Sequence, residues 1–161
     1  MTIMQRTVRF DDAASISENS TGDTWSVWGT PKLITSDVVA VFGGITDNHQ
    51  WIHEDPIRCM RESPYGRQIV HGLLLVAMIP ALLPDEGYTI AGHSVRIVRG
   101  IDNLRLPSPA YPDEFVRMRV RNMCAYPAES GKGTVVERDI EVWSLNGKKP
   151  AVTGRLKLQY F

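Results

Sequence analysis

The segment Ile69–Leu83, with the sequence IVHGLLLVAMIPALL, decides the fold. Apart from His71, Gly72 and Pro80, every residue in it is apolar, so a helix built from it has no polar face. Such a helix is stable only when it is buried on all sides. Pro80 is expected to bend or end the helix, because its ring removes a backbone donor and clashes with the preceding turn. We therefore expect one wholly buried central helix.

After Pro84 the period of the sequence changes from helix to strand. Apolar side chains alternate with charged or polar ones along several runs, which is typical of antiparallel strands with one face in solvent. The Gly-containing segments 130–133 and 146–147 indicate hairpin turns. A longer strand region, Tyr88–Leu106, has a break at Gly100. The inward positions are Val116, Met118 and Val120, then Val136, Ile140 and Val142 with Arg138 as the exception, and finally Leu156, Leu158 and Tyr160.

These two observations favour an α+β fold in which a strongly curved antiparallel sheet wraps around one buried helix. The alternative is a flat sheet with helices on one face. That arrangement would leave one side of the central helix in water and would require a polar stripe on it, which the sequence lacks.

The amino-terminal part is more polar. Residues 1–22 are predicted to form an arm with one helical turn at 11–17, and residues 23–161 a single domain. Trp25–Trp28 suggests a short strand. Thr35 is a helix cap, followed by an amphipathic pattern at Val38, Val41, Phe42 and Ile45. Pro56 is expected to open a short helix through Met60, and 63–66 a turn.

Composition limits the function. The 161 residues carry 18 basic and 18 acidic side chains, so the formal net charge is zero. This argues against a basic nucleic-acid-binding surface and is compatible with an oligomer. The longest apolar run, about 15 residues, is too short for a membrane span. Cys59 and Cys124 lack metal-ligand spacing, and the start of the chain resembles no signal peptide, so we expect reduced thiols and a cytoplasmic protein.

Reactive side chains concentrate in the segment Thr46–Pro56, TDNHQWIHEDP. Its bland interpretation is a hydrophilic loop, but Trp51 and Ile52 anchor it to the core, and two of the four histidines, His49 and His53, lie in it. The turn residues argue against a regular helix here, and with it against a metal site on these two histidines. No dinucleotide-binding glycine pattern occurs, so no cofactor is expected.

The second candidate is the entry to the buried helix, Ile69–Gly72. The first N–H groups of a helix lack partners, and a glycine lets a ligand approach the backbone. Such a donor can polarise a carbonyl oxygen. The alternatives are that Gly72 only packs closely against the sheet and that His71 is an ordinary core histidine.

These segments resemble a known family. ITDNHQWIHEDP at 45–56, followed by SPYG at 63–66 and IVHG at 69–72, resembles the MaoC-like (R)-specific enoyl-CoA hydratases, in particular the nodulation-protein-N-like branch, where a Gln-Trp-Ile-His core is typical. The segment 103–109, NLRLPSP, resembles a later strand of that branch. The likeness covers the layout of residues 25–161.

The resemblance implies a hot-dog fold, usually a homodimer, and hydration of a trans-2-enoyl thioester of coenzyme A or acyl carrier protein, or the reverse dehydration. In that chemistry an aspartate and a histidine hold and activate a water. The resemblance assigns His53 as this histidine, Gly72 as the donor to the thioester carbonyl, and Tyr65, Gly66 and His71 to the substrate. No nucleic acid or membrane partner is implied.

The aspartate departs from the pattern. The family places it five residues before the histidine, usually after a glycine; here Asn48 stands at that position and Asp47 at the usual glycine position. An amide can hold a water but cannot take its proton at neutral pH. Three accounts remain: a local shift brings Asp47 into the role, His53 is the sole base with Asn48 positioning the water, or the site has lost most hydration activity.

Two other functions stay open. One is a different enzyme on the same scaffold, an acyl thioesterase or a double-bond isomerase, because a fold does not fix a reaction. The other is a catalytically silent subunit that binds acyl chains. For the acyl tunnel the candidates are Tyr65, Met60, Leu74 and Met78, which are equally good core residues; Arg96, Arg99, Arg105 and Lys132 are candidates for a nucleotide phosphate or an ordinary solvated face.

Overall fold

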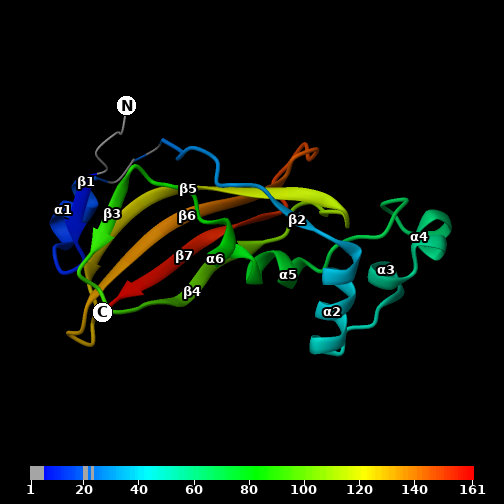
Figure 1. Ribbon diagram of the computed structural model, residues 1–161, viewed down its shortest axis with the longest axis horizontal. Helices are drawn as coiled ribbons and strands as arrows, with labels where there is room; N and C mark the ends of the chain where they lie inside the picture. Colours follow the sequence, from blue (N-terminus) through cyan, green and yellow to red (C-terminus); the bar gives the residue numbers. More distant parts are fainter. Residues whose placement is uncertain (1–5, 20–21, 23) are drawn as a thin grey trace.

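A curved five-stranded sheet dominates the computed structural model, which describes residues 6–19, 22 and 24–161 (Figure 1). Its strands lie in the order β2-β5-β6-β7-β4, and each neighbouring pair is antiparallel. The bounds are β2 Lys32–Ile34, β4 Arg96–Arg105, β5 Glu114–Pro127, β6 Thr134–Ser144 and β7 Val152–Tyr160. The sheet curves past two short helices, as expected from the sequence.

The alternation of side chains explains the sheet. The predicted inward residues of β5, β6 and β7 are all buried, Arg138 included, and most of their neighbours along the strands are more exposed, with Val135 and Gln159 as buried exceptions. The predicted hairpins join β5 to β6 and β6 to β7. Gly133 has a φ of +78°, which few residues other than glycine adopt, and a Cβ there would collide with the carbonyl oxygen of Tyr160.

The prediction of a central helix that Pro80 bends or ends is confirmed, but the prediction that it is wholly buried is wrong. The segment forms two helices, α5 Gly72–Ala77 and α6 Ile79–Leu82, with the break at Met78, two residues before Pro80. Proline cannot supply the backbone donor that a continuous helix needs, so the chain re-enters a helix around it. Leu74, Leu75, Ile79 and Leu82 are buried, but Leu73 is 62% exposed. The helix therefore presents an apolar face outside this chain's own core.

Helix α2, Ser36–Thr46, starts as predicted, with the Thr35 hydroxyl accepting from the N–H of Val38. Its apolar stripe of Val38, Val41 and Ile45 is exposed, whereas Val39 and Gly43 face the core. The periodic pattern thus predicted the helix but not which side of it is buried within one chain.

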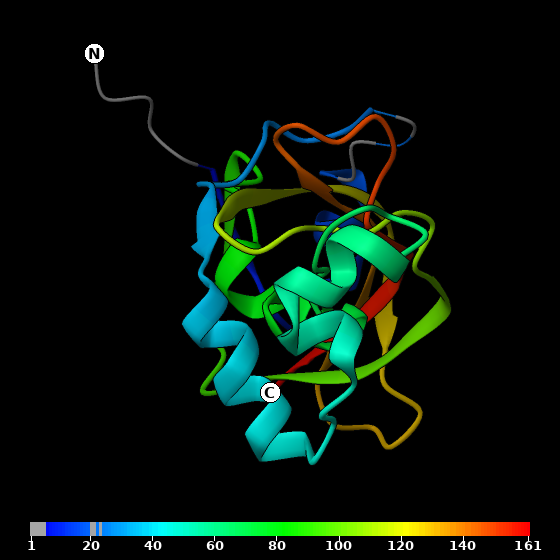
Figure 2. The same ribbon diagram turned by 90° about the vertical axis from the view of Figure 1, so that its right-hand side faces the viewer.

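The segment predicted as an irregular polar loop contains a further short helix, α3 Trp51–Glu54, and α4 follows at Pro56–Glu62. Asp55 caps α4 by accepting from the N–H of Arg58, and Pro56 opens it. The turn at 63–66 is confirmed by a hydrogen bond from the Gly66 N–H to the Ser63 carbonyl. Together α2, α3 and α4 project beyond one end of the sheet (Figure 1), and Figure 2 shows that end facing the viewer.

The opposite end carries a small parallel sheet of β1 Arg6–Arg9 and β3 Tyr88–Ala91, and α1 Ala13–Glu18 packs against β5. The Tyr88–Leu106 region is thus two strands, divided at residues 92–95, and Gly100 marks only a register shift in β4. The segment predicted as a strand at Trp25–Trp28 is not one; Ser26 and Gly29 instead bond to β5 carbonyls.

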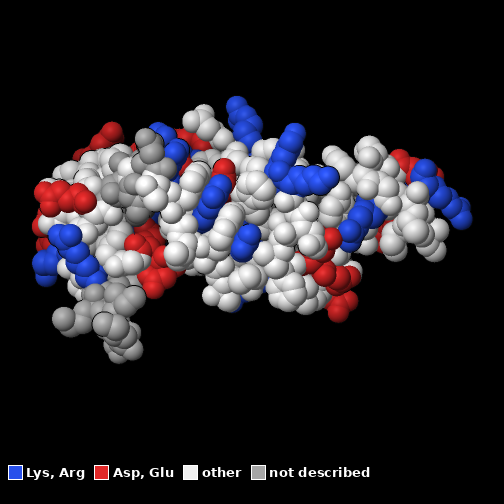
Figure 3. Space-filling model, turned by 90° about the horizontal axis from the view of Figure 1, so that it is seen from above, with Lys and Arg blue, Asp and Glu red and all other residues white. Residues whose placement is uncertain are grey.

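Charged side chains of both signs are spread along the face seen from above (Figure 3). On β5, Arg119 stacks between Trp25, Trp28 and Trp143 and pairs with Glu141 at 2.6 Å. Cys59 is buried, Cys124 is exposed, and both thiols are free. Within the described residues, no helix is long and apolar enough to cross a membrane.

Candidate active site

Two buried histidines stack where α3 meets the start of α5. The rings of His53 and His71 are 3.8 Å apart at 26° and are 9% and 2% exposed. Phe42 of α2 lies 5.2 Å from His71 on its other side. Helix α3 therefore carries His53 from the projecting end directly against the residue that precedes Gly72.

Main-chain carbonyls fix the proton positions on both rings. His53 Nδ1 is 2.9 Å from the carbonyl oxygen of Ile69, and His71 Nε2 is 3.2 Å from that of Asn48. A carbonyl only accepts, so in the neutral rings these nitrogens donate, which leaves His53 Nε2 and His71 Nδ1 as bases. The Nδ1 atom of His71 is buried without a partner.

Burial lowers the pKa of His53, and proximity to His71 lowers it further, whereas the bond to Ile69 opposes the shift. Two stacked imidazoles cannot both hold a charge without strong repulsion. His53 is therefore neutral near pH 7, with one ring nitrogen available to accept a proton.

Asn48 and Asp47 occupy different environments. Asn48 is half-buried, its N–H bonds to the Gly43 carbonyl at 3.0 Å, and its carbonyl accepts from His71. Asp47 ends α2 with a φ of 52°. Its side chain is fully exposed and approaches only to 3.8 Å from His49 Nε2. The structure brings Asn48 to the histidine pair and leaves the Asp47 carboxylate in solvent.

Sequence reasoning did not single out Glu54 or Gln68. Glu54 Oε1 lies 2.6 Å from His49 Nδ1, and this hydrogen bond raises the pKa of His49. Gln68 donates from its side-chain amide to the backbone carbonyl of His53. Because Glu54 follows His53 directly in the sequence, it could have been named as a candidate site residue. The contact of Gln68 depends on tertiary packing, so no local sequence pattern predicts it.

Gly72 lies in a cavity of about 190 Å³ between α5 and the segment after β4. As the first residue of α5, its N–H has no partner within the helix. A Cβ at this position would lie 2.5 Å from Leu106 Cδ1, so the Leu106 side chain would have to move to admit one. The cavity is lined mainly by apolar residues, among them Ile69, Leu75 and Ala110.

Only some of the other predicted substrate residues lie at the site. Tyr65 lines the Gly72 cavity and is partly exposed, and His71 belongs to the histidine pair. Gly66 has a φ of +68° in an exposed turn, and a Cβ on it would meet no atom within 4 Å. Of the tunnel candidates, Met60 is 67% exposed and Leu74 belongs to the core. Among the described residues, no group of three or more His, Cys, Asp or Glu is arranged to hold a metal ion.

Solved structures share this architecture. The (R)-hydratase from A. caviae involved in PHA biosynthesis superposes with a TM-score of 0.65 at 20% identity, covering 87% of this chain and 98% of that one. A monoamine oxidase regulatory protein from Archaeoglobus gives 0.70 at 17% identity, covering 98% of both chains. The fold is the hot-dog fold.

The sequence itself assigns the family. Residues 7–142 match the MaoC like domain, and the chain belongs to this family. It is 32% identical over 130 residues to the 3-hydroxyacyl-thioester dehydratase Z of Mycobacterium tuberculosis, covering 79% of this chain and 82% of the relative. It is 33% identical over 128 residues to Nodulation protein N of Rhizobium meliloti, covering 78% of both.

Proposed function

We propose that this chain catalyses the hydration of trans-2-enoyl thioesters to 3-hydroxyacyl thioesters, and the reverse dehydration. The observation that carries the proposal is the position of His53, a buried neutral base stacked on the residue that precedes the Gly72 amide. The family relation to a 3-hydroxyacyl-thioester dehydratase supports the same reaction.

In the proposed hydration, His53 Nε2 takes a proton from water as the water oxygen attacks C3 of the enoyl group. The electron pair of the double bond moves toward C1, and negative charge develops on the thioester oxygen. The Gly72 N–H stabilises that charge as a hydrogen-bond donor. The imidazolium then returns the proton to C2, so one histidine serves as base and acid and the atoms balance.

We assign Asn48 to positioning the water and His53 to accepting its proton, which is the second of the three accounts given above. Asn48 is half-buried, and its main-chain carbonyl contacts His71, which places the residue beside the histidine pair. The exposure of Asp47 favours this assignment over a shifted carboxylate. Tyr65 and the Gly72 cavity would contact the thioester end of the substrate.

We further propose a cytoplasmic homodimer acting on coenzyme A or carrier-protein thioesters. β4 is an edge strand of the sheet, and Val95 and Ile97 near its start are exposed, as is Leu73 on α5. A long edge strand with apolar side chains is a template for pairing with another chain. A second copy would also cover the outer face of the central helix.

The experiment is incubation of the purified chain with crotonyl-CoA, following both the enoyl absorbance and free thiol. Loss of absorbance without thiol release is the expected result. Thiol release would instead identify a thioesterase. The amide at position 48 favours one alternative, a silent subunit that binds acyl chains. Binding of crotonyl-CoA with neither loss of enoyl absorbance nor release of thiol would support this alternative.

A further inference from the structure

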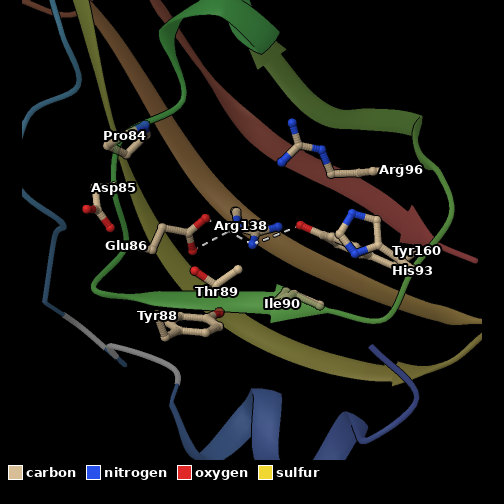
Figure 4. Close-up of a pocket in the computed structure, with 10 residues that line it drawn as sticks. All are labelled: Pro84, Asp85, Glu86, Tyr88, Thr89, Ile90, His93, Arg96, Arg138 and Tyr160. Carbon is tan, nitrogen blue, oxygen red and sulfur yellow. Dashed lines mark hydrogen bonds and ion pairs between the residues drawn. The ribbon is translucent and has the colours of Figure 1, made fainter. Parts of the chain in front are cut away.

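A second cavity, of about 320 Å³, lies at the end of the sheet away from α3 and the histidine pair (Figure 4). One wall is β3 with the loop before it, and the other wall consists of residues from β4, β6 and β7. Its volume is at the lower end of the range of small-molecule sites, roughly 300–1,000 Å³. The proposed hydration uses none of its residues.

Arg138 of β6 lies at the centre of this cavity and is 2% exposed. Its Nε and Nη2 atoms contact the two carboxylate oxygens of Glu86 at 3.1 and 3.0 Å, and Nη2 is 3.3 Å from the Tyr160 hydroxyl. The third nitrogen, Nη1, is buried without a partner. A guanidinium stays charged in proteins, so its burial is costly unless each donor is paired.

His93, in the turn between β3 and β4, adds a second such atom. Its Nδ1 is buried without a hydrogen-bond partner, and its ring packs edge-on against Tyr160 at 5.0 Å. Buried polar atoms nearly always have partners, and an exception calls for a ligand, an ion or a water that completes the site. Two exceptions, one on strand β6 and one in the turn after β3, line the same cavity.

The charges of the lining select the ligand. Arg138 and Arg96 are balanced by Asp85 and Glu86, so the cavity is formally neutral. Glu86 occupies two of the three Arg138 nitrogens, which leaves one donor for a ligand oxygen. A single carboxylate is tolerated in such a site, whereas the two acidic side chains would repel a dianion such as phosphate.

The ligand also has room for a short apolar part. A slot of about 90 Å³ lies beside the cavity and shares Arg96 with it. Its walls are apolar side chains of α6, β4 and β7, including Ile79, Val98 and Leu158. A few methylene groups would fill this slot and remove apolar surface from water.

We propose that the cavity binds a short-chain monocarboxylate, with its carboxylate between Arg138 and Arg96 and its alkyl group in the slot beside α6. Arg138 supplies the buried donor, His93 a second polar contact, and Arg96 the charge at the rim. The burial of Tyr88 raises the pKa of its phenol to about 12, so that wall of the cavity adds no further negative charge.

The test is an NMR titration of the full chain with sodium butyrate, following the imidazole signals of His93. Butyrate is expected to shift these signals and to bind about tenfold more tightly than the neutral isostere butyramide, because the charge-assisted bond is lost in the amide. Inorganic phosphate is expected to bind more weakly than butyrate.

Variants locate the site without removing Arg138, whose loss endangers the fold. Arg96→Ala should weaken butyrate binding about tenfold. Arg99→Ala removes the same charge from the same strand but lines a different cavity, so it should leave the affinity unchanged. His53→Ala should also leave it unchanged, which separates this site from the hydration site. The proposal is overturned if butyrate leaves His93 unaffected, if butyramide or phosphate binds equally well, or if Arg99→Ala matches Arg96→Ala.

Discussion

The two ends of the molecule bury polar side chains in contrasting ways. At one end His53 and His71 are nearly inaccessible and donate to main-chain carbonyls. At the other end Arg138 is equally buried but is held by the carboxylate of Glu86. The first end leaves Nδ1 of His71 buried without a partner, and the second leaves Nη1 of Arg138 and Nδ1 of His93.

The different ionisable groups determine which chemistry each end can perform. An imidazole that is neutral near pH 7 can take a proton and give it back, which acid–base catalysis requires. A guanidinium is protonated at every physiological pH, so it can bind an anion but cannot exchange protons. The same degree of burial therefore suits one end to catalysis and the other to binding.

The largest expected effect is at the imidazole end. His53→Gln removes the base but keeps a polar side chain of similar length. We expect kcat/KM for crotonyl-CoA to fall by about 10²- to 10⁴-fold, the usual contribution of a general acid–base group. Stopped-flow absorbance measures the rate, and circular dichroism checks the fold. A folded variant with near-native turnover would contradict the assignment of His53.

The next effect concerns the other end and affects stability. Glu86→Gln leaves the Arg138 charge buried without its carboxylate, and we expect a loss of about 3–5 kcal/mol of unfolding free energy. Urea denaturation measures it. Glu62→Gln is the matched control, because the pair of Glu62 with Arg58 is on the surface and such pairs contribute about 0–1 kcal/mol. Equal effects of both substitutions would contradict the contrast.

A third substitution tests the amide of residue 72. Gly72→Ala keeps the N–H but places a methyl group against Leu106 Cδ1, 2.5 Å away before any movement. We expect about a 100-fold loss of kcat/KM, as small displacements at a reacting centre cost this much. The double variant Gly72→Ala/Leu106→Ala should recover part of the loss. No recovery in a folded protein would exclude steric displacement as the cause.

A smaller and opposite effect is expected beside the histidines. Asn48→Asp supplies a carboxylate at the position where the family has one, and we expect kcat/KM to rise about tenfold. Asp47→Asn should stay within about twofold of the parent, because its carboxylate is in solvent. The pair is measured in one crotonyl-CoA assay. A loss of activity in Asp47→Asn alone would return the proton-accepting role to Asp47.

The smallest effect is a displacement of the pH profile. Because burial lowers the pKa of His53, its basic form persists below the ordinary histidine value of 6.5. The acidic limb of the kcat/KM profile should therefore have its midpoint below pH 6.5. The dependence of kcat/KM on pH measures this, with an NMR titration of the His53 ring beside it. A midpoint of the acidic limb at or above pH 6.5 would show that the protein does not favour the neutral form of His53.

Much of the fold could be predicted from side-chain periodicity. The alternation in β5, β6 and β7 identified their buried faces, including the position of Arg138 as an exception. Periodicity failed for the central segment, because apolar residues on all faces do not distinguish burial inside one chain from burial against another. Leu73 and the α2 stripe are exposed in this chain.

The candidate site was partly accessible from sequence. The placement of His53 and Gly72 in two separated segments predicted residues that the structure brings together through His71. The sequence did not indicate that carbonyls of Ile69 and Asn48 would fix the ring protons, because such bonds depend on tertiary packing. The cavity around Arg138 joins four strands, and no local motif could have revealed it.

The left-handed conformation of Asp47 bears on how this chain differs from its family. A φ of 52° suits glycine, asparagine or aspartate and penalises other residues. The family's usual glycine at this position meets the same backbone demand. Aspartate is therefore compatible with this backbone conformation, as glycine is. The departure from the family pattern thus covers two neighbouring positions, and only the one at residue 48 exchanges a carboxylate oxygen for an amide nitrogen.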